Sequence, residues 1–111
     1  MTAPMHRTEH LGDLLNREGF FIDPDSWSET IATSLARHDG LPELTDAHWV
    51  ILRELRAHHA RFGTAPPAFS HLCSKHQLGR HCVERLFGSE REAWRIAGLP
   101  DPGEETKTYM Q

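Results

Sequence analysis

The sequence lacks any long apolar run. Nowhere in its 111 residues is there a stretch near the roughly 20 apolar residues that a membrane-spanning helix needs. Residues 1–10 are polar and do not contain the apolar core of a secretory signal. We therefore expect a cytoplasmic protein that makes no membrane contact.

Cysteine is also scarce. The chain has two, Cys73 and Cys82, and in a reducing compartment such a pair does not indicate a disulfide framework. Both fall within helical patterns, so we expect half-buried thiols that serve as small apolar side chains. A redox role stays open, because His71, Lys75 and Arg80 lie nearby in sequence and positive charge favours a thiolate.

Catalytic signatures are missing as well. The sequence contains no nucleophile triad, phosphate-binding loop or paired-carboxylate motif, so we do not expect an enzyme or a cofactor. A zinc site is the alternative to weigh, since thiols and imidazoles cluster in one stretch. Their spacing is not that of a standard zinc motif, and we predict no metal. The residues concerned are His71, Cys73, His76, His81 and Cys82.

What the sequence does contain is an ordinary globular composition with an uneven charge distribution. The net charge is −4, but residues 1–50 carry three Arg and nine acidic residues, whereas residues 51–95 are mainly basic. Solvated helix faces are the usual explanation of such a pattern. A basic half could also meet an acidic partner or nucleic acid.

Helical patterns dominate the chain from residue 26 onward. Ser26 and Glu29 predict a capping box at the start of a first helix, and Thr45 and Gly63 bound the strongest helical stretch. Shorter helices are expected after Pro66 and Pro67, over residues 82–87, and after a second capping box at Ser89 and Glu92. The prediction is a mainly α domain of four to five short helices that cross at steep angles around one core.

The domain organisation follows from the same patterns. Residues 1–10 are expected to form a flexible lead-in and residues 11–102 the helical domain. Residues 103–111 have little to pack and are expected to form a flexible tail.

Several segments, in order, resemble the DsrC/TusE family, which comprises the dissimilatory sulfite reductase gamma subunit and the tRNA-thiolation protein TusE. Leu44-Thr45-Asp46-Ala47-His48-Trp49-Val50-Ile51 is similar to the family's stretch around His-Trp. Ile96-Ala97-Gly98-Leu99-Pro100-Asp101-Pro102 is similar to its Gly-Leu-Pro-x-Pro ending. Other matches are Glu18-Gly19-Phe20, Trp27, Thr64-Ala65-Pro66-Pro67-Ala68 and Leu86-Phe87. The resemblance implies a helical fold with a small N-terminal β-hairpin, here over residues 8–22.

The chain departs from the family at the positions that carry sulfur. The resemblance places the family's reactive cysteine on the C-terminal arm, where this chain has Glu105, and a second cysteine of some members where it has Trp94. Sulfur relay needs an exposed thiolate on a mobile mount, and a carboxylate cannot be persulfidated. Asp101 also replaces the family's usual lysine.

Three functional hypotheses follow. The first is a non-catalytic, partner-binding or regulatory protein of sulfur metabolism that docks on a sulfurtransferase or a sulfite-reductase-type complex through Leu99, Pro100, Asp101 and Pro102. The second is a sulfur carrier that uses Cys73 or Cys82. The third is a helix-turn-helix DNA-binding regulator that contacts nucleic acid through Arg80 and Arg85; the acidic net charge counts against it.

Overall fold

The structure is a computed structural model, and it describes residues 11–110. The expected lead-in, residues 1–10, lies outside the described residues, as does Gln111. Within residues 11–110 the chain is mainly helical and has no strand, which confirms the predicted fold class. The helices are α2 (Leu11–Leu14), the 3-10 turn η1 (Pro24–Ser26), α3 (Glu29–His38), α4 (Asp46–Phe62), α5 (Phe69–Lys75), α6 (Cys82–Phe87), α7 (Glu90–Ile96) and α8 (Glu104–Thr108).

The predicted β-hairpin does not form over the described part of residues 8–22. A single antiparallel bridge joins Leu15 to Phe21. Strand pairing does not extend beyond this bridge, because residues Leu11–Leu14 on its N-terminal side form the helix α2. On the other side, the Phe21 N–H donates to Leu99 O at 3.2 Å.

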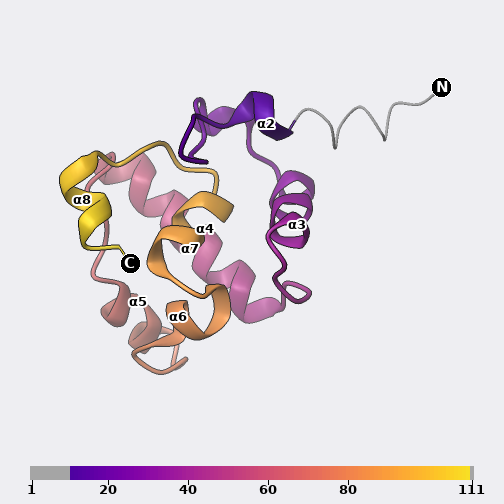
Figure 1. Ribbon diagram of the computed structural model, residues 1–111. Helices are drawn as coiled ribbons and strands as arrows, with labels where there is room; N and C mark the ends of the chain where they lie inside the picture. The colour runs from indigo at the N-terminus through magenta and orange to yellow at the C-terminus, as the bar shows by residue number, and fades with distance from the viewer. Residues whose placement is uncertain (1–10, 111) are drawn as a thin grey trace.

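Helix α4 crosses the molecule behind α7, as Figure 1 shows. Thr45 is its N-cap and Gly63 its C-cap, at φ +70°, as the sequence predicts. The Thr45 N–H donates to His48 Nδ1 at 3.0 Å, and His48 Nε2 lies 2.8 Å from Leu86 O. This buried histidine therefore joins the start of α4 to α6.

Helix α3 begins later than predicted. Its N-cap is Ser28, whose hydroxyl accepts from the Ile31 N–H, and the predicted cap Ser26 belongs to the separate turn η1. Trp27 is thereby free to pack across the domain, where its Nε1–H donates to Ile96 O at 2.8 Å. Gly98 is required beneath it, because a Cβ there would lie 2.1 Å from the indole ring.

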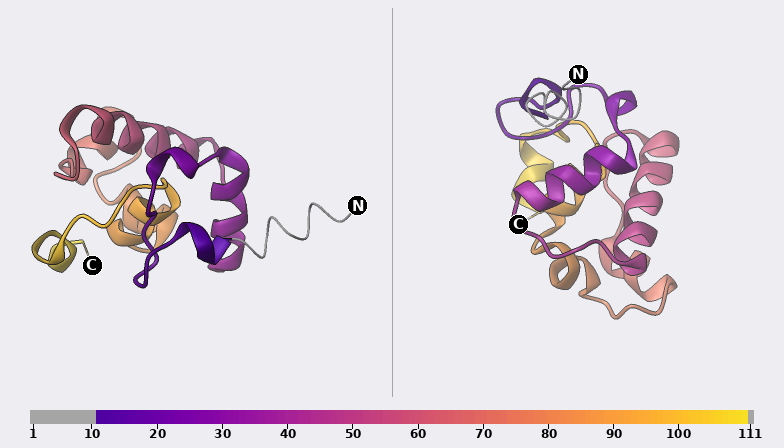
Figure 2. Two further views of the ribbon diagram at one scale, coloured as in Figure 1. Left: turned by 90° about the horizontal axis from the view of Figure 1, so that it is seen from above. Right: turned by 90° about the vertical axis from the view of Figure 1, so that its right-hand side faces the viewer.

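The core lies around α7, which contacts α3, α4 and α6. Its Ala93, Trp94 and Ile96 are fully buried. Helices α2 and α3 lie toward one end of the molecule, and α5 and α6 toward the opposite end (Figure 2). The core therefore extends from the N-terminal segment to the α5–α6 turn.

The C-terminal residues differ from the expected tail. Residues Glu104–Thr108 form α8, Lys107 is buried, and Met110 is 1% exposed. The Met110 carbonyl accepts from the Arg91 N–H at 2.9 Å, which satisfies one of the free donors at the start of α7. The segment finds packing that its composition did not reveal, because its partners lie elsewhere in the chain.

No helix within the described residues is both long enough and apolar enough to cross a membrane.

Candidate functional site

The C-terminal segment, defined here as residues 99–110, is where the resemblance places sulfur chemistry. It leaves α7 close to the core: Pro100 O accepts from Trp94 Nε1–H at 2.7 Å. Of the four residues predicted to bind a partner, Leu99 and Pro102 are buried, and Pro100 and Asp101 are half-buried. Contact through Leu99 or Pro102 would therefore require the segment to move off the domain.

Asp101 connects this segment to the N-terminal loop. Its carboxylate accepts from Asn16 Nδ2 at 3.2 Å, from the Gly103 N–H at 2.9 Å and from Lys107 Nζ at 3.1 Å. Burial works to raise the pKa of Asp101, but the hydrogen bonds from Gly103, Lys107 and Asn16 outweigh burial and hold it below the usual range. Asp101 is therefore ionised at neutral pH and ready to pair with a cation.

That cation is Lys107, whose side chain is only 5% exposed. Its Nζ lies 2.7 Å from Glu18, 3.0 Å from Glu104 and 3.1 Å from Asp101. The hydrogen bond to Glu18 leads the contributions that raise the pKa of Lys107, although desolvation opposes them. Nζ also lies 5.7 Å from the centre of the Phe20 ring. We call this group of Glu18, Asp101, Glu104 and Lys107 the arm latch.

Glu105, which the resemblance places at the position of the family's reactive cysteine, takes no part in this latch. It is exposed on α8, and its side chain makes no hydrogen bond or ion pair with residues 11–110. Tyr109, at 76% exposed, is also open to solvent. The outer face of α8 thus presents a carboxylate and a phenol ring to the solvent.

Trp94, which the resemblance places at the second cysteine position, is fully buried. Its ring meets that of His59 edge-on at 6.4 Å between centroids. A side chain in this place supports the core and the segment after it, and it has no access to solvent.

The two cysteines form a disulfide, which corrects the expectation of two thiols. Cys73 on α5 and Cys82 on α6 are bonded, with 5.7 Å between their Cα atoms, and both are 0% exposed. A tight turn brings the two helices together: Gln77 and Gly79 both have positive φ, and the Leu78 N–H donates to Cys73 O. The number and spacing of the cysteines do not reveal this turn. The sequence analysis therefore did not predict the disulfide.

Arg80 and Arg85 lie at this same corner. Arg85 folds back over the turn, where its Nη2 donates to Leu78 O at 2.8 Å. Arg80 is exposed and its side chain has no partner within residues 11–110. The structure thus places both residues predicted to contact nucleic acid at one corner. Only Arg80 is without a side-chain hydrogen bond or ion pair to residues 11–110.

A buried charge cluster on α7 was missed by the sequence reasoning. Arg95 Nη1 lies 2.7 Å from both Asp39 and Glu92, and Arg95 Nε donates to Gly19 O. Burial, followed by a hydrogen bond with Asp39, raises the pKa of Glu92 to about 7. The spacing of Glu92 and Arg95 on one helix was a visible signal, whereas Asp39 joins them only through the fold.

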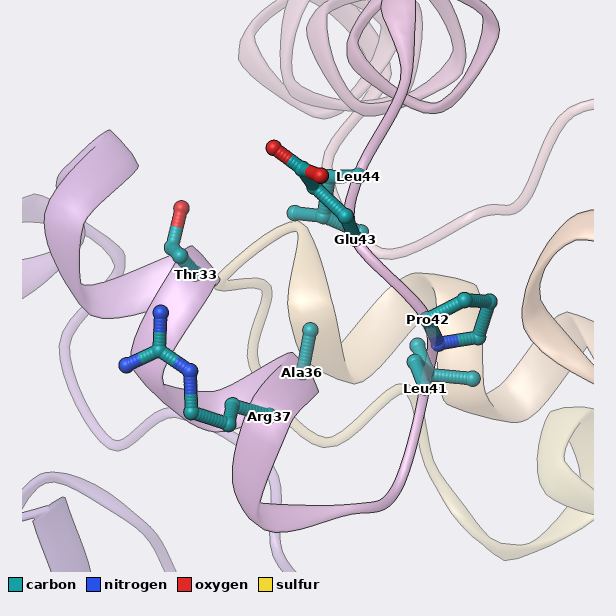
Figure 3. Close-up of a pocket in the computed structure, with 7 residues that line it drawn as sticks. All are labelled: Thr33, Ala36, Arg37, Leu41, Pro42, Glu43 and Leu44. Carbon is teal, nitrogen blue, oxygen red and sulfur yellow. The ribbon is translucent and has the colours of Figure 1, made fainter.

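The described residues contain no group of three or more His, Cys, Asp or Glu side chains arranged to hold a metal ion. One cavity of about 310 Å³ lies between α3 and the chain that follows it. Figure 3 shows Arg37 on α3 and Glu43 on the opposite segment at this cavity. None of the residues predicted for function lines it.

Comparison with known proteins identifies the family of this chain. The family model described as DsrC like protein matches residues 12–104. The sulfurtransferase TusE of Yersinia pestis is 33% identical over 80% of this chain and 96% of its own length. TusE of Salmonella typhimurium is 31% identical over 77% of this chain and 84% of its own.

Solved structures agree as well. The oxidised gamma-subunit of the dissimilatory sulfite reductase (DsrC) from Archaeoglobus fulgidus superposes with a TM-score of 0.69 at 35% identity, over 81% of this chain and 89% of that one. DsrC from Allochromatium vinosum gives 0.67 at 28% identity, over 81% and 87%. The fold and its C-terminal segment therefore define a DsrC-like protein. The chain belongs to the DsrC/TusE family of sulfur-relay proteins.

Proposed function

We propose that this chain is a non-catalytic member of the family that docks on a sulfurtransferase or sulfite-reductase-type complex and regulates access to it. The observation that carries the proposal is the exposed carboxylate of Glu105, which the resemblance places at the position of the reactive cysteine. A carboxylate oxygen cannot take up a sulfane sulfur, so this position can be presented to a partner but cannot carry cargo.

The state of the two cysteines supports a non-catalytic role. A relay thiol must be reduced, exposed and mobile enough to enter the partner's active site. Cys73 and Cys82 are bonded to each other and fully buried between α5 and α6. The competing proposal, a carrier that uses one of them, therefore requires both reduction and opening of this part of the core.

The arm latch supports regulation by docking. The C-terminal segment is held on the domain by ion pairs around Lys107 together with the buried side chains of Leu99, Pro102 and Met110. Charged groups at a partner's surface could replace the ion pairs. The names of the relatives, a sulfurtransferase and a subunit of a sulfite reductase, motivate the class of partner. A cytoplasmic location is part of this proposal.

The test is a competition experiment. The sulfurtransferase or sulfite-reductase-type complex from the same organism is immobilised, loaded with a labelled cysteine-bearing family member, and titrated with this chain. We expect displacement of the label without sulfur transfer to this chain. Asp101→Lys together with Lys107→Glu, which changes the charge pattern of the segment, should alter the affinity, whereas Arg53→Gln on the exposed face of α4 should not. Absence of displacement at any concentration would contradict docking.

DNA binding stays a prediction from sequence. The Arg85 side chain is hydrogen-bonded to Leu78 O in the turn. A DNA-recognition surface at α6 would therefore depend mainly on Arg80. A mobility shift that is lost in Arg80→Gln would favour this alternative over protein docking.

A further inference from the structure

One long stretch of this acidic protein contains no acidic residue. Between Glu54 and Glu84 there is no Asp or Glu, while four Arg or Lys residues and five His residues occur. These are Arg56, Arg61, Lys75, Arg80, His58, His59, His71, His76 and His81. The stretch covers the end of α4, all of α5 and the turn before α6. Its charge would favour an anionic ligand on this face.

Two of the four Arg or Lys residues in this stretch already have hydrogen-bond or ion-pair partners. Arg56 donates to the carbonyls of Ala97 and Pro24, and Lys75 pairs with Glu54 at 3.3 Å. Arg61 and Arg80 make no hydrogen bond or ion pair with any residue from 11 to 110, but Arg61 lies 5.4 Å from the centre of the Phe62 ring. Of the two, only Arg80 lines a cavity with other hydrogen-bond donors.

Arg80 lines a shallow cavity of about 400 Å³, wide open to solvent, with three side chains of α5: Ser70, His71 and Ser74. Each of the four can donate a hydrogen bond, and no carboxylate lines the cavity. The side chains of Ser70, His71 and Ser74 also make no hydrogen bond with the described residues. A pocket lined by uncommitted donors and a cation matches a small anion with several acceptor oxygens.

The disulfide holds the two walls of this cavity in place. Cys73 lies on α5 beside Ser74, and Cys82 lies two residues after Arg80. The turn between them is also tied by its backbone, since the Cys82 N–H donates to Gly79 O at 3.0 Å. Donors that are already positioned lose less conformational entropy when a ligand binds.

We propose that Ser70, His71, Ser74 and Arg80 form a binding site for a tetrahedral oxyanion, braced by the Cys73–Cys82 disulfide. The ligand is a sulfate or phosphate group, either as the free ion or as part of a larger molecule. Arg80 supplies the charge and two N–H donors, and the serine hydroxyls and the imidazole complete the contacts. The site is independent of the proposed docking through the C-terminal segment.

The experiment is a ¹⁵N NMR titration of the oxidised protein with sodium sulfate and sodium phosphate, with sodium chloride used to hold the ionic strength constant. We expect saturable shifts confined to α5 and the turn, with a Kd on the order of 1 mM because the site is open to water. Arg80→Gln should weaken binding by about tenfold or more, as the loss of a charge-assisted contact predicts. The matched control, Arg53→Gln, removes an exposed α4 arginine that does not line the cavity and should leave binding unchanged.

Two further arms sharpen the result. A short duplex oligonucleotide that shifts the same residues at far lower concentration would identify the ligand as a nucleic-acid phosphate, and binding of the inorganic ions alone would identify a free oxyanion. Reduction of the disulfide should weaken binding several-fold; unchanged affinity would contradict the bracing role. Shifts that do not saturate, or that persist in Arg80→Gln, would overturn the site itself.

Discussion

The two ends of this small domain are held by different kinds of interaction. At the C-terminal segment, Lys107 is paired with three carboxylates contributed by Glu18, Asp101 and Glu104. At the corner formed by α5 and α6, a buried disulfide joins Cys73 to Cys82. Ion pairs can exchange with charged groups of a partner, whereas a fully buried disulfide opens only after reduction. The comparison predicts that the C-terminal segment opens more readily than the α5–α6 corner.

The largest expected effect is at Trp94, which supports the C-terminal segment from within the core. Trp94→Ala should lower the free energy of unfolding by about 3–5 kcal/mol, because it removes a fully buried ring and leaves a cavity. Denaturant unfolding followed by circular dichroism measures this. The control is Tyr109→Ala, an exposed aromatic of the same segment, which should stay within about 0.5 kcal/mol of the wild type. Equal stabilities for the two variants would contradict the placement of Trp94.

The disulfide should have the next largest effect. Its two cysteines are separated by 9 positions, and closure of a loop of that size should stabilise the oxidised protein by about 2–3 kcal/mol. Unfolding curves with and without dithiothreitol measure the difference. The Cys73→Ala, Cys82→Ala double variant should be insensitive to the reductant. Identical curves for the oxidised and reduced wild type would show that the corner does not depend on the bond.

A smaller effect should appear as a function of pH at the Glu92 cluster. Burial raises the pKa of Glu92 from 4.5 to about 7, so the folded protein holds a proton that the unfolded chain has released. This contribution to stability is present below pH 4.5 and is lost as pH rises toward 7. We expect a loss of about 1–2 kcal/mol across that window, since solvent reaches part of the side chain.

Glu92→Gln removes this titration and should flatten the dependence of stability on pH between these limits. Glu43→Gln, at an exposed site outside the cluster, serves as the control and should keep the wild-type slope. The same pH slope in Glu92→Gln as in the wild type between pH 5 and 7 would contradict the protonated state of Glu92.

The smallest effect on global unfolding should come from Lys107, although its local effect should be clear. Lys107→Met removes the cation of the arm latch and leaves Glu18 paired with Arg91 of α7. Amide hydrogen exchange should accelerate over residues 103–110 and stay unchanged in the core. Lys75→Met, which removes a surface ion pair with Glu54, should leave the C-terminal segment protected. A higher salt concentration should also accelerate amide exchange over residues 103–110 of the wild type, because salt screens the ion pairs of the latch.

The sequence predicted the parts of the fold that depend on local signals. Helix α4 was located by Thr45 and Gly63 because a cap and a left-handed glycine act within one turn of the helix. The start of α3 was placed at Ser26 instead of Ser28, since both serines can cap and only the packing of Trp27 against Ile96 decides between them.

The candidate site was predictable only in part. Family resemblance assigns Glu105 and Trp94 to the family's two cysteine positions through the register of the Gly-Leu-Pro-x-Pro ending, and this assignment stays a prediction. The arm latch was not predicted, since Glu18 and Lys107 lie 89 residues apart. The disulfide was missed for a related reason: the turn at Gln77 and Gly79, rather than the cysteine spacing, brings the two sulfur atoms together.

The most direct test of the central claim is whether this chain can carry sulfur. The native protein and a Glu105→Cys variant are exposed to a persulfide donor under identical conditions, and intact-mass spectrometry counts the sulfur atoms gained. We predict no gain for the native protein, whose cysteines are buried and bonded, and a gain of one sulfur for Glu105→Cys, which restores a thiol on the exposed face of α8. A gain on the native protein, mapped to Cys73 or Cys82, would contradict the non-catalytic account and identify the chain as a carrier with a relocated thiol.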